Sequence, residues 1–576
     1  MSIFRILMMI TAVLGLAAQP VTGICAEPAA PTPLTPLLSN KPQPKPKPKP
    51  PLSALPAGIE ATPLSPLDPT WGNALPAGAT PLPPQMWQGT SRAVVRAVLP
   101  LLSPTRSPAI DALTRRLLLS GATAPAGTDP AAGPSLLLLR AKRLYDLGMV
   151  PGALAVLRLV PPDRRSEAMA RLRVELAVTE GDVAGACQRV DAAIMGYREV
   201  WWDRVQIACQ LLNGDRAKAK VALEVLRDRN VPAAPTFDRL VAAAEGHPVT
   251  LPKSARLSPL GATLWAMSKR PLPEAVIAGA APATLIAFAD NDTEPAGNRL
   301  GAAERAAALG AWSPKRLAAL YGKVKIDKPA RAKLLAETRL GDTPRGRAIL
   351  FDAARQAHDP GVKAEILRRL LDAARRHDLT FVAARLTAPL ILAMKPQKAM
   401  KPVALAFIRA LVTTDRPQAI APWLPLADPA EIGPLATLVR IIEGTTPPPT
   451  AAAIQGALKL LAARKGRAAR DQTEMFLMLA AAFGTHATPP ELVAALVPAR
   501  HGTVPSLALW LDQRNAAVAH CLGETLLTSL AMATTTDHHL TLEPVVLARV
   551  VAGIRAAGLD HAAQRIALEA AIAVGM

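Results

Sequence analysis

Most of the chain alternates between Ala/Leu/Arg-rich segments and short breaks. From about Gln85 onward the segments are about 12–16 residues long, and Gly, Pro and Asp separate them. The alternation of β-branched and aromatic residues that is typical of strands is absent. The pattern therefore predicts an all-α protein. The clearest later helices are expected at Ala302–Leu309, Ser313–Tyr321, Lys363–Arg375, Pro402–Thr413, Ala451–Ala463 and Arg470–Ala482.

Three stretches of the sequence repeat one another with a period of 33 residues. Each contains a glycine, an alanine five residues later and an apolar residue nine residues later. The glycines are Gly148, Gly181 and Gly214, the alanines Ala153, Ala186 and Ala219, and the apolar residues Leu157, Val190 and Leu223. Glycine readily adopts the left-handed conformation that ends a helix, and a small alanine lets the next helix approach closely. We therefore expect two helices per repeat, stacked as hairpins.

This spacing resembles that of tetratricopeptide repeats, helical hairpins with a period of 34 residues. The resemblance implies such hairpins over residues 85–250, but the family's aromatic signature positions are missing, so no peptide-binding residue can be carried over. Fainter copies follow Asp378 and Gly558, and we expect residues 251–576 to form an irregular helical solenoid. The whole chain resembles exported, Ala/Leu-rich helical proteins of bacterial envelopes, which implies a fold and a compartment but no activity.

The N-terminus has the three-part layout of a secretory signal peptide. A short basic region precedes the apolar run Ile6–Ala18, and small residues follow it. We expect a signal peptide at residues 1–26, cleaved after Ala26 or after Gly23, with a retained membrane anchor as the alternative. Lipidation of Cys25 is disfavoured because the residue before it is isoleucine. The sequence thus predicts the periplasm of a bacterial envelope, or secretion.

Residues 27–84 are dominated by proline and hold 18 of the chain's 57 prolines. Their centre reads Lys41-Pro-Gln-Pro-Lys-Pro-Lys-Pro-Lys-Pro-Pro51. Alternating proline removes amide donors and fixes backbone torsions, which favours an extended polyproline II helix. We expect a disordered spacer that resembles the Lys-Pro spacers of envelope proteins. The alternative is a tract that docks to an anionic wall polymer or to a partner's groove.

The chain is basic, with 66 Lys and Arg against 45 Asp and Glu and a formal net charge of +21. Residues 1–84 carry only 5 − 3 = +2 of this charge, so the predicted helical part carries +19. Such a surface attracts anions, whereas an aromatic fraction of 3% offers few stacking platforms for single-stranded nucleic acid. We expect an acidic protein, peptidoglycan or lipid headgroups as partners, and no nucleic acid. The alternative is a solvated helix face without a partner.

The cysteines suggest a covalent cross-link. Cys187 and Cys209 are expected on neighbouring antiparallel helices, where their Cα atoms can come within the roughly 5.5–6 Å that a disulfide needs. An oxidising compartment would join them. We predict a Cys187–Cys209 disulfide with Trp201 or Trp202 packed against it, and two buried thiols are the alternative. Cys521 is expected to be a buried core cysteine with a free thiol.

Candidate metal and catalytic motifs are weak. The acidic stretch Asp290-Asn-Asp-Thr-Glu294 lacks the glycine and the final glutamate of a calcium loop, so we expect a turn between helices. Asp537-His538-His539 is the only histidine cluster, and it has no further ligand at a defined spacing. The common nucleotide-binding, metalloprotease, redox and nucleophile-elbow motifs do not occur. We therefore expect no catalytic residue, no metal and no cofactor.

These observations favour an exported periplasmic scaffold or adaptor whose helical solenoid binds an envelope protein. Two alternatives stay open. One is a basic solenoid that binds the anionic cell wall or membrane surface, and the other is a cell-wall-processing enzyme with an unrecognised site. Membrane contact is expected only if the N-terminal segment is a retained anchor.

Overall fold

The fold is all-α throughout the part of the chain that the structure describes. The computed structural model describes residues 69–131, 133–161, 164–229, 231–324, 339–485, 505–534 and 543–576. Within these ranges helices are joined by turns, and a single isolated bridge between Ser91 and Ala126 stands in place of any strand. The predicted all-α solenoid of helical hairpins is therefore confirmed. The predicted signal peptide and the spacer up to residue 68 lie outside the described residues.

The first part of the fold is a series of short helices. They are α1 (Arg92–Val98), α2 (Pro108–Leu119), α3 (Leu136–Asp146), α4 (Val150–Arg158), α5 (Glu167–Thr179), α6 (Val183–Ala193), α7 (Val200–Leu212), α8 (Arg216–Asp228), α9 (Pro235–Ala244), α10 (Pro259–Met267), α11 (Glu274–Ala278), α12 (Pro282–Asp290), α13 (Ala296–Ala308) and α14 (Pro314–Tyr321).

The second part continues with somewhat longer helices. They are α16 (Pro344–Gln356), α17 (Pro360–Arg376), α18 (Thr380–Leu392), α19 (Lys401–Val412), α20 (Pro429–Ile442), α21 (Ala451–Ala463), α22 (Arg467–Ala482), α24 (Leu507–Val518), α25 (Leu522–Thr534), α26 (Pro544–Ala556) and α27 (Asp560–Ala573). The six helices expected from the sequence coincide, within six residues at either end, with α13, α14, α17, α19, α21 and α22.

Helix starts follow local sequence signals. Ser107, Ser313 and Asp359 each accept a hydrogen bond from an amide of the first turn, and a proline follows each of them. The missing N–H of proline costs nothing in the first turn, and its fixed φ suits a helix. Prolines at these positions therefore begin helices rather than break them.

Helix ends share one hydrogen-bonded turn. At Gly148, Gly181 and Gly214 φ is +74°, +82° and +84°, and the amide of the next residue donates to the carbonyl five residues before it. This is the Schellman turn, which the left-handed glycine permits. The same turn follows α9, α13, α17, α20, α22, α24, α26 and α27, with Asp378 after α17 and His520 after α24 in place of glycine. The same helix-ending turn is thus used well beyond the three clear copies of the sequence repeat.

Consecutive helices pack as hairpins around buried alanines. Helices α3 and α4, α5 and α6, and α7 and α8 contact one another in pairs. Ala153, Ala186 and Ala219 are at most 2% exposed, as expected for residues that let two helices approach. The chain then turns back, because α10 contacts α5 and α7, and α12 contacts α5. The solenoid therefore does not continue in one direction.

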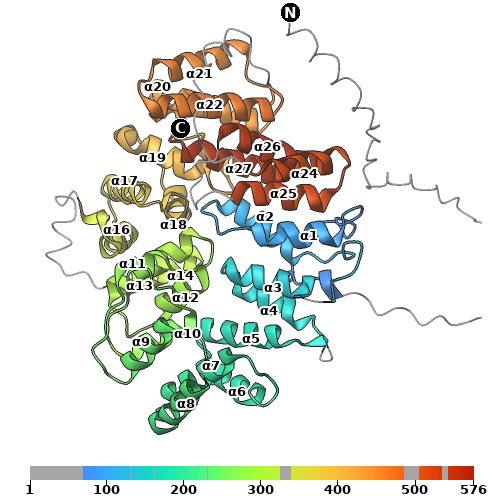
Figure 1. Ribbon diagram of the computed structural model, residues 1–576. Coiled ribbons are helices and arrows are strands. Elements are labelled where there is room, and N and C mark those ends of the chain that lie inside the picture. Colours follow the sequence, from blue (N-terminus) through green and yellow to red (C-terminus); the bar gives the residue numbers. More distant parts are fainter. Residues whose placement is uncertain are drawn as a thin grey trace, which may run out of the picture.

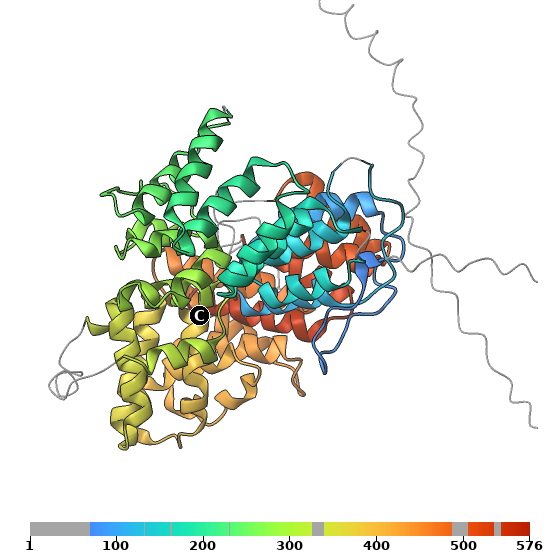
Figure 2. The same ribbon diagram turned by 90° about the horizontal axis from the view of Figure 1, so that it is seen from below.

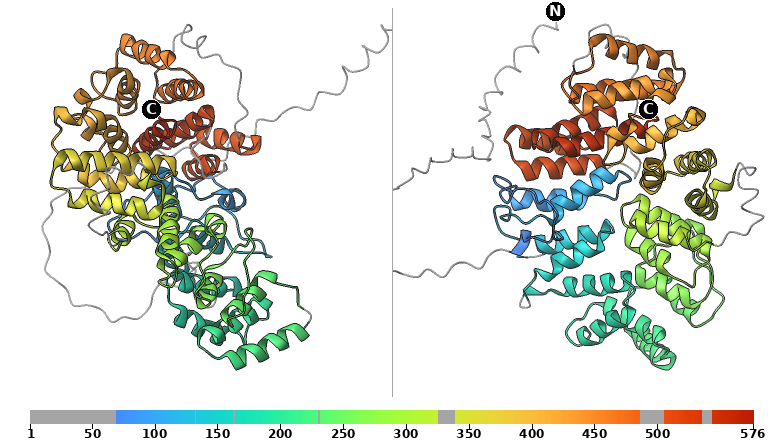
Figure 3. Two further views of the ribbon diagram at one scale, coloured as in Figure 1. Left: turned by 90° about the vertical axis from the view of Figure 1, so that its left-hand side faces the viewer. Right: turned by 180° about the vertical axis from the view of Figure 1, so that it is seen from behind.

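The first and last helices lie against each other. Helices α1–α5 occupy one side of the molecule and α13–α18 the other (Figures 1 and 2), while α25 packs on α1 and α2 and α27 packs on α2. The amide of Ser103 donates to Thr534 Oγ1 at 3.1 Å, which joins the segment before α2 to the end of α25. The views from the side and from behind show the same arrangement (Figure 3).

The packed fold begins earlier than the sequence suggests. The spacer was expected to run to Pro84, but Trp71 and Leu82 are at most 1% exposed and belong to the main hydrophobic core. Arg140 holds this segment, donating from Nη1 to the Thr70 carbonyl at 3.1 Å and from Nη2 to the Gly72 carbonyl at 2.9 Å. The proline-rich composition of this segment gives no sign of these buried apolar residues, and residues 69–84 belong to the packed fold and not to the spacer.

No helix in the described ranges is both long enough and apolar enough to span a membrane. The apolar run from Ala275 to Ala289 is divided between α11 and α12. Pro282, at the start of α12, marks the division, as its missing N–H requires.

Candidate functional site

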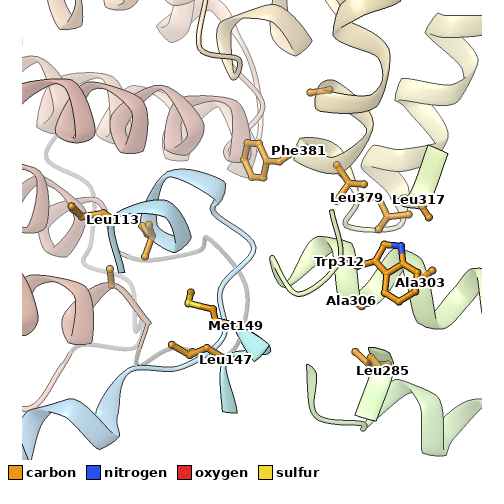
Figure 4. Packing of buried hydrophobic residues seen from close by; sticks show 14 of the residues in the cluster. Leu113, Leu147, Met149, Leu285, Ala303, Ala306, Trp312, Leu317, Leu379 and Phe381 are labelled. Carbon is orange, nitrogen blue, oxygen red and sulfur yellow. The ribbon is translucent and has the colours of Figure 1, made fainter. Parts of the chain in front are cut away.

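A pocket of about 880 Å³ lies between the two sides of the fold. One wall comes from α2, the α3–α4 turn and α4, and the other from α12, the α13–α14 turn and α18. Met149, Trp312 and Phe381 contribute large apolar side chains to it. Figure 4 shows Met149 on one side of this space and Trp312 and Phe381 on the other. We call it the central pocket.

Two glycine turns meet beside the central pocket. A Cβ atom on Gly148 would lie 2.4 Å from the Cβ of Ala311, and one on Gly310 would lie 2.7 Å from the carboxyl group of Asp111. Both glycines have a positive φ, +74° and +71°. The turns that end α3 and α13 can therefore approach this closely only because neither carries a side chain at that position.

Three ion pairs line the pocket walls. Arg316 Nη2 contacts both carboxylate oxygens of Asp290 at 2.8 and 2.9 Å, and its guanidinium lies 3.6 Å from the centroid of the Trp312 ring. Arg106 Nη1 lies 2.7 Å from Asp378 Oδ2. Arg115 Nη2 lies 3.1 Å from Asp111 Oδ2. Each of the three aspartates is thus neutralised by its own arginine.

Asp111 is the most perturbed acid of the pocket. Burial raises its pKa from 3.8 to about 6, although the charges of Arg115 and Arg385 act to lower it. The carboxyl group remains mainly ionised at neutral pH and takes up a proton in mildly acidic solution. The charge of this wall therefore depends on pH.

Arg158 and Arg385 are the two arginines of the pocket outside these three ion pairs, although the charge of Arg385 still acts on Asp111 and Glu569. Both are exposed, and neither forms an ion pair with a carboxylate in the described ranges. Five arginines and four acids line the pocket, and the fourth acid, Glu180, lies at the end of α5 without an arginine partner among the same residues. Guanidinium groups bind carboxylates in a bidentate manner. The pocket can therefore accept an anionic group beside an apolar wall.

Serine hydroxyls in the pocket take part in helix capping. Ser107 Oγ accepts from the Ile110 amide and donates to Glu569 Oε2, and Ser313 Oγ accepts from the Arg316 amide. Their hydrogen bonds hold the starts of α2 and α14 in place.

A disulfide joins Cys187 on α6 and Cys209 on α7, the pair predicted from the sequence. The Cα atoms are 5.5 Å apart. Trp202 is buried in the same small apolar cluster, as expected, and its Nε1 donates to Glu167 Oε1 at 2.8 Å. This cluster is separate from the main core, and none of its cysteines lines the central pocket. The bond therefore joins the α5–α6 hairpin to the α7–α8 hairpin and does not form part of the pocket.

Cys521 differs from its prediction. It is buried as expected, at 5% exposure, but it is disulfide-bonded, so the expectation of a free thiol is wrong. Its partner lies outside the described residues. The spacing argument applied to Cys187 and Cys209 finds pairs on adjacent helices, and it gives no partner for Cys521.

The acidic stretch Asp290–Glu294 is a turn between α12 and α13, as expected. Asp290 pairs with Arg316, Asp292 lies 2.6 Å from Arg299, and Glu294 accepts from the Asn298 side chain at 3.1 Å. No group of three or more His, Cys, Asp or Glu suited to a metal occurs in the described part of the chain. The cluster Asp537-His538-His539 lies outside that part.

A recurrent role of arginine is not apparent from the sequence. Several arginines donate to a carbonyl in the last turn of a neighbouring helix, where the helix leaves carbonyls without partners. They are Arg140 to Leu118 of α2, Arg173 to Leu157 of α4, Arg305 to Ala278 of α11, Arg299 to Ala289 of α12, Arg565 to Val412 of α19 and Arg555 to Ala482 of α22. The only sequence signal is the excess of arginine itself.

Comparison with known proteins adds no family. No protein-family model matches the chain, and neither a curated protein nor a solved structure shows significant similarity to it.

Proposed function

We propose that this chain is an exported helical-repeat scaffold or adaptor of the tetratricopeptide type, and that its central pocket binds an extended acidic segment of an envelope protein. The observation that carries the proposal is the pocket of about 880 Å³, which combines an apolar wall with two arginines that form no ion pair with a carboxylate among the described residues.

The size and lining of the pocket suit a short peptide segment. Ligand pockets typically measure about 300–1,000 Å³ and combine apolar walls with a few polar groups. Met149, Trp312 and Phe381 supply an apolar wall that a leucine or phenylalanine side chain could contact. Helical-repeat proteins commonly bind extended segments on their inner surfaces.

The charges of the pocket favour an acidic segment. Asp111, Asp290 and Asp378 are already paired with arginines of the pocket. Arg158 and Arg385 remain for carboxylates that the ligand brings. Arginine is well suited to this role because its planar group forms two parallel hydrogen bonds to one carboxylate.

Export rests on the signal-like N-terminus and is compatible with the disulfide. Disulfides persist in the periplasm and outside the cell, and they are rare in the reducing cytosol. The Cys187–Cys209 bond would therefore be stable where the N-terminal segment would direct the chain.

Peptide binding can be measured directly with the full-length processed protein. The probe is a labelled peptide in which glutamates flank a leucine, and a glutamine version serves as its control. Arg158→Glu/Arg385→Glu should raise the Kd for the glutamate peptide by at least about tenfold, because a hydrogen bond to a charged group contributes about 1.5–3 kcal/mol. Arg227→Glu on α8, an exposed arginine away from the pocket, should leave Kd unchanged. Equal binding of both peptides would contradict the proposal.

Crosslinking in the cell identifies the natural ligand. A photo-crosslinking amino acid at Ala155, which lines the pocket, should capture a protein at an acidic segment, whereas the same group at Arg227 should not. Sedimentation with isolated cell wall and with phosphatidylglycerol vesicles tests the alternative of an anionic surface. Binding to either that is unaffected by Arg158→Glu/Arg385→Glu, together with no protein crosslink at Ala155, would refute the adaptor.

A further inference from the structure

A second pocket, of about 170 Å³, lies between α17 and α19 beside the end of α27. It shares no lining residue with the central pocket. Its apolar lining is aliphatic and comes from all three helices, with Leu371 of α17, Leu405 and Ala406 of α19 and Ile572 of α27. Helices α17 and α19 contact each other, and α19 also contacts α27. We call it the α17–α19 pocket.

The charged residues that line the α17–α19 pocket are three arginines and one aspartate. Arg368 and Asp372 pair with each other on α17, where Nη1 lies 2.6 Å from Oδ2. Arg368 also pairs with Glu365, one turn earlier, at 2.7 Å. Arg375 is exposed and forms neither an ion pair nor a hydrogen bond with a described residue. The aspartate is thus already matched by Arg368, and the guanidinium group of Arg375 is left for a ligand.

Arg409, the third arginine, is held in place by the residues that follow α27. Its Nε donates to the main-chain oxygen of Met576 at 2.7 Å and its Nη2 to that of Gly575 at 2.9 Å. A guanidinium group has N–H donors on all three nitrogens, so Nη1 of Arg409 can still donate to a ligand. Burial lowers the pKa of Arg409, and the nearby charge of Arg375 acts in the same direction. The two guanidinium groups therefore repel each other, and an anion between them would relieve that repulsion.

The combination of guanidinium groups and an aliphatic wall favours a carboxylate that carries a short hydrocarbon chain. Arginine binds carboxylates in a bidentate geometry, and an aliphatic wall favours burial of the chain. An apolar cavity of about 150 Å³ holds a molecule of the size of benzene, so about 170 Å³ suits roughly six to eight non-hydrogen atoms. We propose that the α17–α19 pocket binds an aliphatic carboxylate of about four to six carbon atoms, with its carboxylate between Arg375 and Arg409 and its chain against the aliphatic residues. This site is independent of the peptide ligand proposed for the central pocket.

Ligand-observed NMR with the full-length processed protein tests the site. The probe is pentanoate at neutral pH, and its controls are pentan-1-ol, which lacks the charge, and acetate, which lacks the chain. Pentanoate should bind, and both controls should bind at least about tenfold more weakly. Arg375→Gln should raise the Kd for pentanoate by at least about tenfold, because a charge-assisted hydrogen bond is lost. The variant should fold like the wild type, since Arg375 is exposed.

Arg376→Gln is the matched control. Arg376 is the next residue and is also exposed, but it pairs with Asp342 at 2.9 Å and does not line the pocket, so its substitution should leave the Kd for pentanoate unchanged. Ala406→Phe, which fills the pocket and keeps Arg375, should abolish binding. The absence of pentanoate binding, or equal Kd values for wild type and Arg375→Gln, would overturn the proposal. Loss of binding in Arg158→Glu but not in Arg375→Gln would also overturn it, because the carboxylate would then lie in the central pocket.

Discussion

At the scale of single residues, arginine joins one helix to the end of another. The carbonyl end of a helix carries a partial negative charge, and arginine satisfies both that charge and the unpaired carbonyls. Arg565 Nη1, for example, donates to the Val412 carbonyl at the end of α19 at 3.0 Å. Part of the net charge of +21 is therefore structural. Other arginines, such as Arg227 on α8, are exposed.

Arg140 offers the sharpest test of this role. It is fully buried, its three donor nitrogens contact the carbonyls of Thr70, Gly72 and Leu118, and burial lowers its pKa to about 9. Arg140→Met keeps much of the side-chain volume but leaves three acceptors unsatisfied. We expect a loss of about 3 kcal/mol or more in the free energy of unfolding, measured by urea denaturation.

The control for that substitution is Arg227→Met on α8, which should change the free energy of unfolding by less than about 0.5 kcal/mol. Equal effects of the two variants would show that the carbonyl contacts of Arg140 contribute nothing.

At the scale of elements, one type of turn ends many of the described helices, but its surroundings differ. A Cβ atom on Gly181 would meet no other atom within 4 Å, whereas one on Gly148 would meet Ala311 across the fold. The sequence shows two equivalent copies of a repeat. Only their neighbours, which come from residues more than a hundred positions away, make them different.

Substitution of these glycines by alanine separates the backbone strain of the turn from the steric contact with a neighbouring segment. Gly181→Ala should cost about 1–2 kcal/mol of unfolding free energy, the strain of a left-handed alanine. Gly148→Ala should cost at least about 1 kcal/mol more, because its Cβ would overlap with Ala311 as well. Both are measured by urea denaturation, and a smaller effect at Gly148 would contradict the close approach of the two turns.

The disulfide should stabilise the packing of α6 against α7 without affecting distant helices. Closing a loop of 22 residues contributes about 3 kcal/mol in the chain-entropy model. Cys187→Ala/Cys209→Ala should therefore lower stability by about that amount, and amide exchange should become faster in α6 and α7 while the pocket helices keep their protection. If amide exchange became faster around Trp312 and stayed unchanged in α6, the disulfide would not be a local stabiliser.

At the scale of the whole molecule, α27 holds the start of α2. Glu569 is 1% exposed, accepts from Ser107 Oγ at 2.5 Å and from the Ala109 amide at 3.2 Å, and thus lies at the positive end of the helix. Burial nonetheless raises its pKa from 4.5 to about 7, although these two hydrogen bonds act to lower it. The contact that joins the ends of the fold is therefore sensitive to pH.

The sign of that sensitivity follows from linkage. Because the folded state binds the proton of Glu569 more tightly than the unfolded state, this group's contribution to stability is greatest below pH 4.5 and is lost as the pH rises towards 7. Between pH 5 and pH 8 the loss is about 2–3 kcal/mol. In Glu569→Gln this loss should be absent, so the difference in unfolding free energy between wild type and variant should shrink or reverse with rising pH. A parallel pH dependence of the two proteins would contradict the raised pKa.

The central pocket also belongs to this scale. Its arginines and aspartates come from α2, α4, α12, α14 and α18 and from the turns around them, and they meet because the chain turns back after α8. Of its charged residues, Asp290 was expected in a turn and Asp378 at a fainter repeat position. None was expected to share a pocket, since no spacing along the chain relates segments so far apart.

The sequence by itself determined the helices, the turns inside the three hairpins α3–α4, α5–α6 and α7–α8, and the partners of one disulfide. These features depend on contacts within one helix or between adjacent ones, so local spacing encodes them. The tertiary structure decided that the ends of the solenoid meet, that residues 69–84 belong to the fold and that Cys521 is bonded. It also decided which arginines cap helices and which face the pocket. Such contacts depend on how successive hairpins are rotated against each other, and small packing differences that no periodicity records accumulate along the whole chain.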